Sequence, residues 1–369
     1  LSDRKNSILD DPKSWHNVFL REVTLRVDES VFEPLYKVGG RPNAPLRVLL
    51  AMMILKEGNG WSDEQLFNSC RFDIRCMRAL GLYHVGDDIP VESTYYEFRR
   101  RLTDYNKDAK VDLVGKAFSN AVRGQIEAFN LKGEKVRMDS KLIQSNIRRA
   151  SRLDLILETV RVSILYFEPS VLAGKLVDKD IALLVALKSK TTSNITYPLN
   201  NEERKDMLIR LGNIIKHLLP YCNEGSQLHR LYSEHYHEVE DKGDDKGPEK
   251  RTMLKDAKEV TSDSLQSAHD PEAAFRRKGQ GNSEQQVTGY HANVTETISD
   301  ENKFQLITDV QTEAANICED AFLRPAIEGS NNVLNTDGPS QKTINHVTTD
   351  GGYDSKANRE TMALEGSPH

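Results

Sequence analysis

Two aspartates occupy comparable places in two short β-prone segments of this 369-residue chain. Asp139 lies inside residues 135–142, where even-numbered residues are apolar or small and odd-numbered residues are charged. Asp350 follows the β-prone residues 344–349 and precedes two glycines. Aspartate is depleted in strands because its short polar side chain competes with the backbone for hydrogen bonds, so its presence here favours a chemical role. An exposed aspartate on an edge strand is the alternative for Asp139.

Carboxylates on two neighbouring strands are suited to metal binding. Hard cations such as Mg²⁺ prefer oxygen ligands, and two such carboxylates can share one or two ions. Gly351 and Gly352 let the backbone turn sharply beside an ion, and Ser355 is placed to cap a helix over residues 356–364. The pattern therefore predicts a metal site formed by Asp139 and Asp350.

Several further segments extend this pattern along the chain. They are FDIRCMRALGL at Phe72–Leu82, STYYEFRRRL at Ser93–Leu102, MDSKLI around Asp139, GYHANVTE around Tyr290, LITDVQTEAAN at Leu306–Asn316 and TTDGGYDS around Asp350. In this order they resemble bacterial insertion-sequence DDE transposases, which have a helical N-terminal DNA-binding region and an RNase H-like catalytic domain. The resemblance covers nearly the whole chain and rests on the order of the motifs.

The resemblance implies an α+β fold, in which an all-helical N-terminal domain precedes an RNase H-like mixed sheet that is interrupted by a helical insertion. The expected parts are a helix-turn-helix-like DNA-binding domain over residues 1–130, a catalytic core over residues 131–142 and 285–369, and the insertion over residues 143–284. In an RNase H-like sheet the first and last strands are adjacent. Both aspartates are then expected at one edge of the sheet.

The implied function is binding of terminal inverted repeats followed by metal-dependent cleavage and transfer of DNA strands. Two Mg²⁺ (or Mn²⁺) ions held by Asp139 and Asp350 are the implied cofactors. The implied partners are double-stranded DNA, at the element ends and at the target, and a second copy of the chain in a homodimer assembled on DNA. The chain is expected to be cytoplasmic and associated with the nucleoid.

The family also uses a glutamate on a helix beyond the second aspartate. Glu360 and Glu365 are the only candidates, and both follow Asp350 more closely than the family pattern requires. We therefore expect a C-terminally truncated chain that lacks the third acid and cleaves DNA poorly. The alternative functions are a non-catalytic DNA-binding remnant that represses transposition, and a metal-dependent nuclease unrelated to mobile elements.

The net charge of −6 does not by itself indicate a nucleic-acid-binding protein, but phosphate responds to the local field. Residues 132–152 contain seven basic and two acidic residues around the first aspartate. A solvated charged face is the alternative interpretation of such clusters. The candidate DNA-binding residues are Arg99, Arg100, Arg101, Lys141, Arg148, Arg149, Arg276, Arg277 and Lys278.

No apolar run approaches the roughly 18 residues that span a membrane, and the N-terminus does not resemble a signal peptide. The four cysteines form no CxxC pair, so they are expected to be free thiols rather than zinc ligands or disulfides. We also expect His229, His235 and His237 to be surface residues, because their spacing does not match that of a metal-binding HExxH motif. His291 and His346 lie on predicted strands and could line the metal site or be buried and neutral.

The N-terminal region predicts successive helices. Pro45 suits a helix start, the turn at residues 58–60 suits its end, and Ser62 with Gln65 forms a capping-box pattern. Helices separated by a glycine-containing turn and followed by a basic helix are typical of a helix-turn-helix DNA reader. A plain helical bundle shares this pattern and remains the alternative.

Local spacing gives five further predictions. Residues 72–80 predict one more helical turn, which buries Phe72, Ile74, Met77 and Leu80. A basic helix is expected to start at Ser93 or Thr94, where Thr94 and Glu97 form a second capping-box pattern. Downstream, residues 241–251 predict an exposed loop, residues 287–297 and 304–312 a hairpin, and residues 319–328 a helix interrupted by Pro325.

Overall fold

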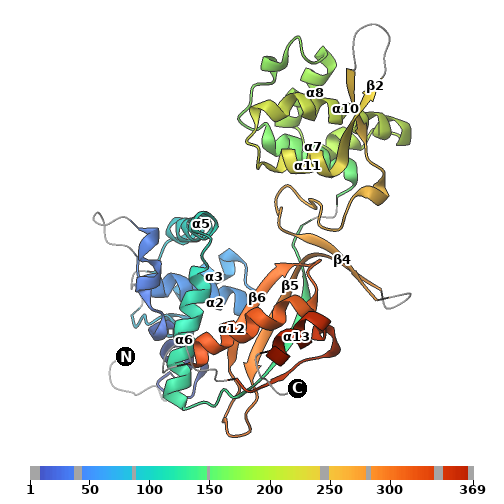
Figure 1. The fold of residues 1–369 in the computed structure, drawn as a ribbon. Coiled ribbons are helices and arrows are strands. Elements are labelled where there is room, and N and C mark those ends of the chain that lie inside the picture. The colour runs from blue at the N-terminus through green and yellow to red at the C-terminus, as the bar shows by residue number, and fades with distance from the viewer. Residues whose placement is uncertain are drawn as a thin grey trace. The chain divides into compact units, whose positions relative to one another are not determined.

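The computed structural model describes residues 9–36, 44–84, 89–147, 150–241, 249–279, 284–335 and 344–364 (Figure 1). The chain divides into two compact units. Unit 1 comprises Leu1–Asp139, Val294–Gln311 and Asp320–His369, and unit 2 comprises Ser140–Asn293 and Thr312–Glu319. Arg148, Arg149 and Glu365, which the sequence singled out, lie outside the described residues.

A helical N-terminal region precedes a mixed β-sheet, as the sequence predicted. The strand order is β4-β5-β1-β7, and β6 pairs with β5. β1 and β7 are parallel, whereas β4 and β5 are antiparallel. The predicted fold class and the predicted hairpin are therefore confirmed. The strands are β1 Lys135–Gln144, β4 Ala274–Lys278, β5 Gln285–Thr297, β6 Ile307–Ala314 and β7 His346–Thr348.

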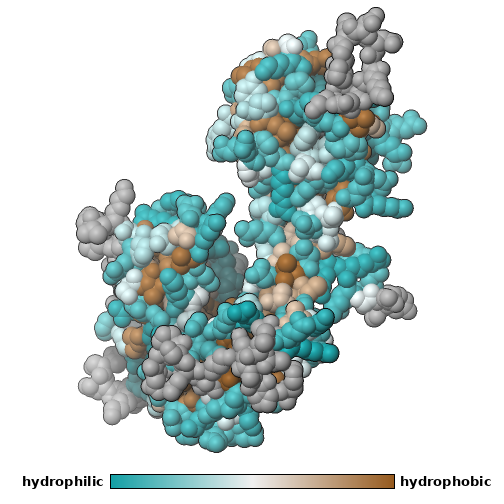
Figure 2. Space-filling view, in the orientation of Figure 1, coloured by the Kyte–Doolittle hydropathy of each residue, from teal (hydrophilic) through white to brown (hydrophobic). Residues whose placement is uncertain are grey.

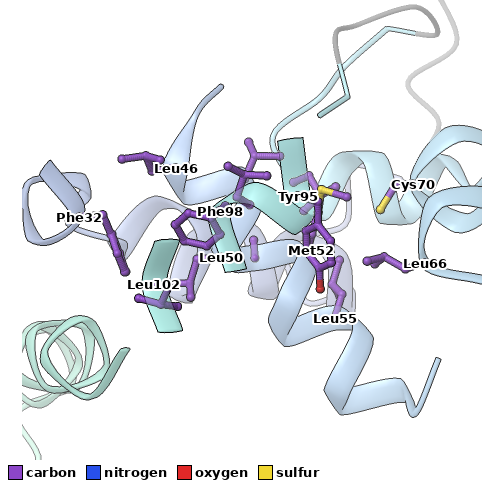
Figure 3. Close-up of a cluster of buried hydrophobic side chains, with 14 of the residues drawn as sticks. Phe32, Leu46, Leu50, Met52, Leu55, Leu66, Cys70, Tyr95, Phe98 and Leu102 are labelled. Carbon is purple, nitrogen blue, oxygen red and sulfur yellow. The ribbon is translucent and has the colours of Figure 1, made fainter. Parts of the chain in front are cut away.

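The N-terminal part of unit 1 packs around one apolar cluster. Figure 3 shows side chains from η2, α2, α3 and α5 meeting there, among them Phe32, Met52, Leu66 and Phe98. Burying so many large apolar side chains is the main source of stability for this region. The elements are α1 Trp15–Glu22, η1 Thr24–Arg26, η2 Glu29–Leu35, α2 Leu46–Asn59, α3 Asp63–Phe72, α4 Ile74–Ala79, α5 Glu92–Ala109 and α6 Leu113–Phe129.

Two predicted helix ends are confirmed. α2 ends at Gly60, whose φ of 64° lies in the left-handed region that glycine adopts without strain. The capping box at the start of α3 is present, because the Gln65 amide donates to Ser62 Oγ at 3.2 Å while Gln65 Oε1 accepts from the Ser62 amide at 2.9 Å.

Two other predictions in this region are wrong. α5 starts at Glu92 with Val91 at the N-cap, so Thr94 lies inside the helix and its capping box does not form. Phe72 and Ile74 are 79% and 56% exposed rather than buried. The helical spacing breaks at Asp73, which is extended and caps α4 by accepting from the Arg75 amide at 2.9 Å. This break turns the two side chains away from the buried Met77.

The C-terminal part of unit 1 packs against β1. Val136 shares an apolar cluster with Ile126 of α6 and Val333 of α12, while Met138 packs with Phe322 and Tyr353. The predicted interrupted helix is a 3₁₀ turn followed by an α-helix with Pro325 in its first turn, where proline costs little. These elements are η7 Glu319–Phe322, α12 Leu323–Leu334, η8 Gly351–Tyr353 and α13 Lys356–Leu364.

Unit 2 contains a helical core and a two-stranded hairpin between β1 and β4. Its helices are α7 Arg152–Ser163, α8 Asp178–Ser189, α9 Thr192–Thr196, α10 Asn201–Leu218 and α11 Gln227–His235, with 3₁₀ turns η3 Pro169–Leu172, η4 Leu219–Tyr221 and η5 Ala257–Glu259. The hairpin pairs β2 Tyr236–Asp241 with β3 Glu249–Leu254. The predicted loop at residues 241–251 is therefore wrong at its ends, because cross-strand pairing extends the strands into charged sequence.

The predicted surface position of His235 is also wrong, because this side chain is 3% exposed. Hydrophilic residues cover most of the face shown in Figure 2, and hydrophobic residues form small separate areas. Within the described part of the chain, no helix combines the length and apolar character needed to cross a membrane.

Candidate functional site

Asp139 lies on β1, which runs between β5 and β7 in the sheet. Val136 and Met138 are buried beneath it, whereas Arg137 and Asp139 are exposed on the opposite face. This alternation follows from the two-residue period of a strand. The Arg137 guanidinium is held by Glu296 of β5, with Nη2 and Oε1 2.5 Å apart. Asp139 thus projects outward from a strand whose other face is fixed by apolar packing.

The parallel pairing of β1 with β7 ends two positions before each aspartate. Lys135 pairs with His346, and Arg137 pairs with Thr348, so every partner differs by the same number of positions. Continuing this register by two residues sets Asp350 opposite Asp139. The backbone at Asp350 is extended, with φ −82° and ψ 176°, as this continuation requires.

Opposite residues of a parallel pair point to the same face, and neighbouring strands lie about 4.8 Å apart. Asp139 on β1 and Asp350 just after β7 are both exposed, and both belong to unit 1. Asp350 Oδ1 also accepts from the Gly352 amide at 2.9 Å, which closes the first turn after the strand. The glycine pair permits this tight turn directly beside the carboxylate.

The segment after Asp350 is anchored on both sides. Tyr353 is 1% exposed and packs with Met138, while Ser355 Oγ accepts from the Asn358 amide at 3.2 Å and caps α13 as predicted. The Asn358 side chain donates to the carbonyl oxygens of Asp320 and Tyr353, each at 2.9 Å. These bonds hold the turn that carries Asp350 against α12 and its preceding 3₁₀ turn.

The two candidates for a third acid are Glu360 and Glu365. Glu360 lies on α13, where its carboxylate is exposed and 3.7 Å from the Lys356 ammonium. Glu365 lies outside the described residues. Within the described ranges, no group of three or more His, Cys, Asp or Glu side chains is arranged to hold a metal ion. Asp139 and Asp350 are thus the two acids that the continued register of β1 and β7 would set opposite each other.

The histidines on the strands have different surroundings. His346 is exposed at the start of β7, with Nε2 3.4 Å from Thr348 Oγ1. His291 is 1% exposed on β5 in unit 2 and makes hydrogen bonds through both ring nitrogens. One of its partners is Ser140, the residue after Asp139. Sequence reasoning did not find this pair, because its members are 151 positions apart and no local spacing links them.

The three consecutive arginines of α5 are not equivalent. Arg100 lies between Glu97 and Asp104, at 2.8 and 2.7 Å, and Arg101 also contacts Glu97 at 2.8 Å. The guanidinium carbon of Arg99 lies 5.7 Å from the centre of the Tyr95 ring, and that of Arg101 lies 4.9 Å from the centre of the Tyr36 ring. Neighbouring carboxylates therefore offset much of the charge of Arg100 and Arg101.

The basic residues of β1 and β4 are also distinguished by their contacts. Lys141 is exposed on β1. Arg276 is half-buried, and its Nη1 donates to the Ile317 carbonyl oxygen at 2.5 Å. Arg277 pairs with Glu284 at 2.6 Å, and Lys278 pairs with Glu319 at 2.8 Å. Among these four residues, Arg276, Arg277 and Lys278 each contact an oxygen atom of the protein, and Lys141 is exposed on its strand.

The N-terminal helices lie in a segment that matches a known family model. Residues 7–101 match the family model described as Transposase domain (DUF772). The match runs from before α1 into α5 and includes the helix break at Asp73 and the arginines of α5. It supports a transposase role, and a transposase acts on DNA. Searches of curated proteins and of solved structures find no match.

Proposed function

We propose that this protein is a DDE transposase that binds the terminal inverted repeats of a mobile element and catalyses metal-dependent cleavage and transfer of its DNA strands. The observation that carries the proposal is the parallel pairing of β1 with β7, whose register, if continued two residues past Arg137 and Thr348, sets Asp350 opposite Asp139. The transposase domain match over residues 7–101 independently supports DNA as the substrate.

The donor set fits a hard divalent cation. Both side chains offer carboxylate oxygens on an exposed strand face, which suits Mg²⁺ or Mn²⁺ better than soft metals. When bound, such ions, in this family two of them, would activate the attacking oxygen and stabilise the leaving oxygen of a phosphodiester. Asp139 and Asp350 would hold the ions, while β1 and the turn at Gly351 fix the directions of the two carboxylates.

We further propose a division of labour along the chain. Residues 1–130 bind the element ends, residues 131–142 with 285–369 form the catalytic core, and residues 143–284 form an insertion. The candidate DNA contacts are Arg99, Arg100, Arg101, Lys141, Arg148, Arg149, Arg276, Arg277 and Lys278, which would contact phosphates rather than read bases. Two copies of the chain would assemble on paired DNA ends.

The test is Mg²⁺-dependent nicking of a duplex that carries one element end, combined with Mn²⁺ binding followed by electron paramagnetic resonance. We expect Asp139→Asn and Asp350→Asn each to abolish nicking and to weaken Mn²⁺ binding, because the amide removes a charged oxygen ligand. Asp354→Asn is the matched control, because Asp354 lies four positions further on and pairs with Arg359 instead.

DNA binding should survive in both active-site variants, since phosphate contacts lie elsewhere. Nicking or Mn²⁺ binding that is unchanged by both substitutions would reject the metal site. Specific binding of the end duplex by wild-type protein that never nicks it would instead favour a DNA-binding repressor.

A further inference from the structure

The His291 ring links three parts of unit 2. Its Nδ1 lies 2.8 Å from the carbonyl oxygen of Ile317, in the segment after β6. Its Nε2 lies 3.0 Å from Ser140 Oγ on β1. The side chain is 1% exposed, so both contacts are shielded from water. A buried ring with two such contacts holds a defined orientation.

The partners of the ring differ in what they can donate. The Ile317 carbonyl oxygen only accepts, whereas the Ser140 hydroxyl can donate to Nε2 or accept from it. Two charged groups also flank the ring, because Arg276 Nη1 lies 3.4 Å from Nδ1 and Glu319 Oε1 lies 3.9 Å from Nε2. The Ser140 hydroxyl thus adds a side-chain contact to the backbone pairing of β1 with β5.

Arg276 fixes the other end of the same contact. Its Nη1 donates to the carbonyl oxygens of Ile317 and Ala315, at 2.5 and 3.3 Å, and thereby orients the group that holds His291 Nδ1. The Ala315 amide in turn donates to the carbonyl oxygen of Gly289 on β5 at 3.0 Å. β4, β5 and the segment after β6 thus form one frame, and Ser140 attaches β1 to it.

We propose that Ser140 and His291 are positioning residues for Asp139. Ser140 directly follows Asp139, and successive strand side chains point to opposite faces. The bond between Ser140 and His291 therefore restrains β1 next to Asp139 from the opposite face of the strand. A metal ligand must be held within about 0.5 Å of its working position, so this bond adds to the restraint that pairing with β5 and β7 gives the strand. The inference rests on the proposed metal site.

Three variants separate positioning from simple packing. Ser140→Ala removes the hydroxyl alone. His291→Asn places an amide near the Nδ1 position, so it keeps a donor to the Ile317 carbonyl oxygen and loses the hydrogen bond with Ser140. His291→Gln reaches the Nε2 position, so it keeps an acceptor for the Ser140 hydroxyl and loses the hydrogen bond with Ile317. Asp139→Asn reports the loss of the site itself, and Thr308→Ala controls for a buried hydroxyl bond elsewhere, because Thr308 Oγ1 contacts Ser330 at 2.8 Å.

The measurements are Mn²⁺ affinity by electron paramagnetic resonance, the Mg²⁺ concentration that half-saturates nicking, and the melting temperature of the full chain. We expect Ser140→Ala and His291→Asn to weaken Mn²⁺ affinity and to raise the half-saturating Mg²⁺ concentration by about tenfold. This is the lower end of the loss in metal affinity that follows from mutating residues around the metal ligands. His291→Gln should stay within about twofold of wild type, although it also breaks a buried bond.

A purely structural role predicts a different order. His291→Asn and His291→Gln would then change metal affinity equally and in proportion to their melting temperatures, and Ser140→Ala would resemble Thr308→Ala. Either result would overturn the inference while Asp139→Asn still abolishes Mn²⁺ binding. If wild type and Asp139→Asn bind Mn²⁺ equally, the proposed metal site itself fails.

Discussion

Asp309 on β6 has a different environment from the two aspartates of the strand pair. Its carboxyl is mostly buried and points at Gly329 of α12, where an added Cβ would collide with Oδ1. Burial raises the pKa of Asp309 to about 6, although a hydrogen bond from Gln311 at 2.8 Å acts in the opposite direction. Asp309 also lines a cavity of about 460 Å³, with Lys116 and Arg123 of α6 among its neighbours.

The raised pKa of Asp309 gives unit 1 a specific pH dependence. The native state keeps this proton up to about pH 6, whereas the unfolded chain loses it near pH 4. The free energy of unfolding should therefore fall as pH rises from about 4 to 6, by roughly 3 kcal/mol from this group. Asp309→Asn cannot ionise, so it should remove most of this fall. Both tryptophans, Trp15 and Trp61, lie in unit 1, so tryptophan fluorescence during urea unfolding measures the effect.

Gln311→Ala is a useful companion, because it removes the bond that favours the charged form and should steepen the fall. Equal pH dependence in wild type and Asp309→Asn would show that Asp309 is already ionised at pH 4. Gly329→Ala should destabilise unit 1 at every pH, since its methyl group meets Asp309 regardless of charge.

At the scale of single residues, the sequence was informative where a residue type departs from the local structural preference. Asp139 interrupts an alternating strand, and Asp350 precedes two glycines, so each stood out from its neighbours. The contacts of the basic residues could not be predicted, because Arg276 reaches Ile317 across 41 positions. The environment of His235 was missed for the same reason, since Arg152 is 83 positions away.

Among the elements, the junction of α7 with α11 shows how unit 2 is held together. Arg152, the first residue of α7, donates from Nε to His235 Nδ1 at 3.0 Å and from Nη1 to the Lys255 carbonyl oxygen at 2.9 Å. Arg152 therefore joins a helix start, a helix end and the residue after β3. Burial, with Arg152 and Lys255 nearby, lowers the pKa of His235 to about 4.

This junction should weaken in mild acid. The unfolded chain protonates His235 near pH 6.5, whereas the native state resists protonation down to about pH 4. Stability is therefore complete above pH 6.5 and falls by roughly 3 kcal/mol as pH decreases from 6.5 to 4. His235→Asn keeps an acceptor for Arg152 and cannot be protonated, so its stability should change less over this range. Hydrogen exchange resolved to α7 and α11 measures the difference.

His237→Asn is the matched control, because His237 is exposed on β2 and should leave the pH dependence unchanged. If His235→Asn and wild type lose protection in α7 equally between pH 6.5 and 4, another group controls the acid lability of unit 2.

The order of the elements was predictable because hydrophobic period and capping residues are local signals. α7, α10 and the β5–β6 hairpin follow from such patterns. The errors occurred where a longer-range contact or a backbone break decided the outcome. Residues 241 and 249–251 read as loop because their charges hide cross-strand pairing, and Phe72 read as core because the break at Asp73 has no periodic signal.

For the whole molecule, the net charge of −6 opposes general attraction to DNA. Binding must therefore arise from particular basic side chains whose charge is not already offset. The ion pairs on α5 show that a run of three arginines is a poor measure of this quantity, because Glu97 contacts two of them. Sequence can count charges on a helix, but only side-chain geometry distinguishes an offset arginine from one that is available to phosphate.

The salt dependence of DNA binding tests this distinction. Each phosphate contact releases close to one counterion, so its loss lowers the slope of log affinity against log salt by about 0.9. We expect Arg99→Gln to lower the slope by about this amount, because Arg99 lies over the Tyr95 ring and is not held between two carboxylates as Arg100 is. Arg100→Gln should change it by much less, since Glu97 and Asp104 already hold this guanidinium. The triple replacement of Arg99, Arg100 and Arg101 should then resemble Arg99→Gln, and fluorescence anisotropy with an end duplex at several salt concentrations measures all three.

Equal slopes in wild type and the triple variant would place the phosphate contacts outside α5, whereas a larger effect of Arg100→Gln would mean that DNA displaces its carboxylate partners.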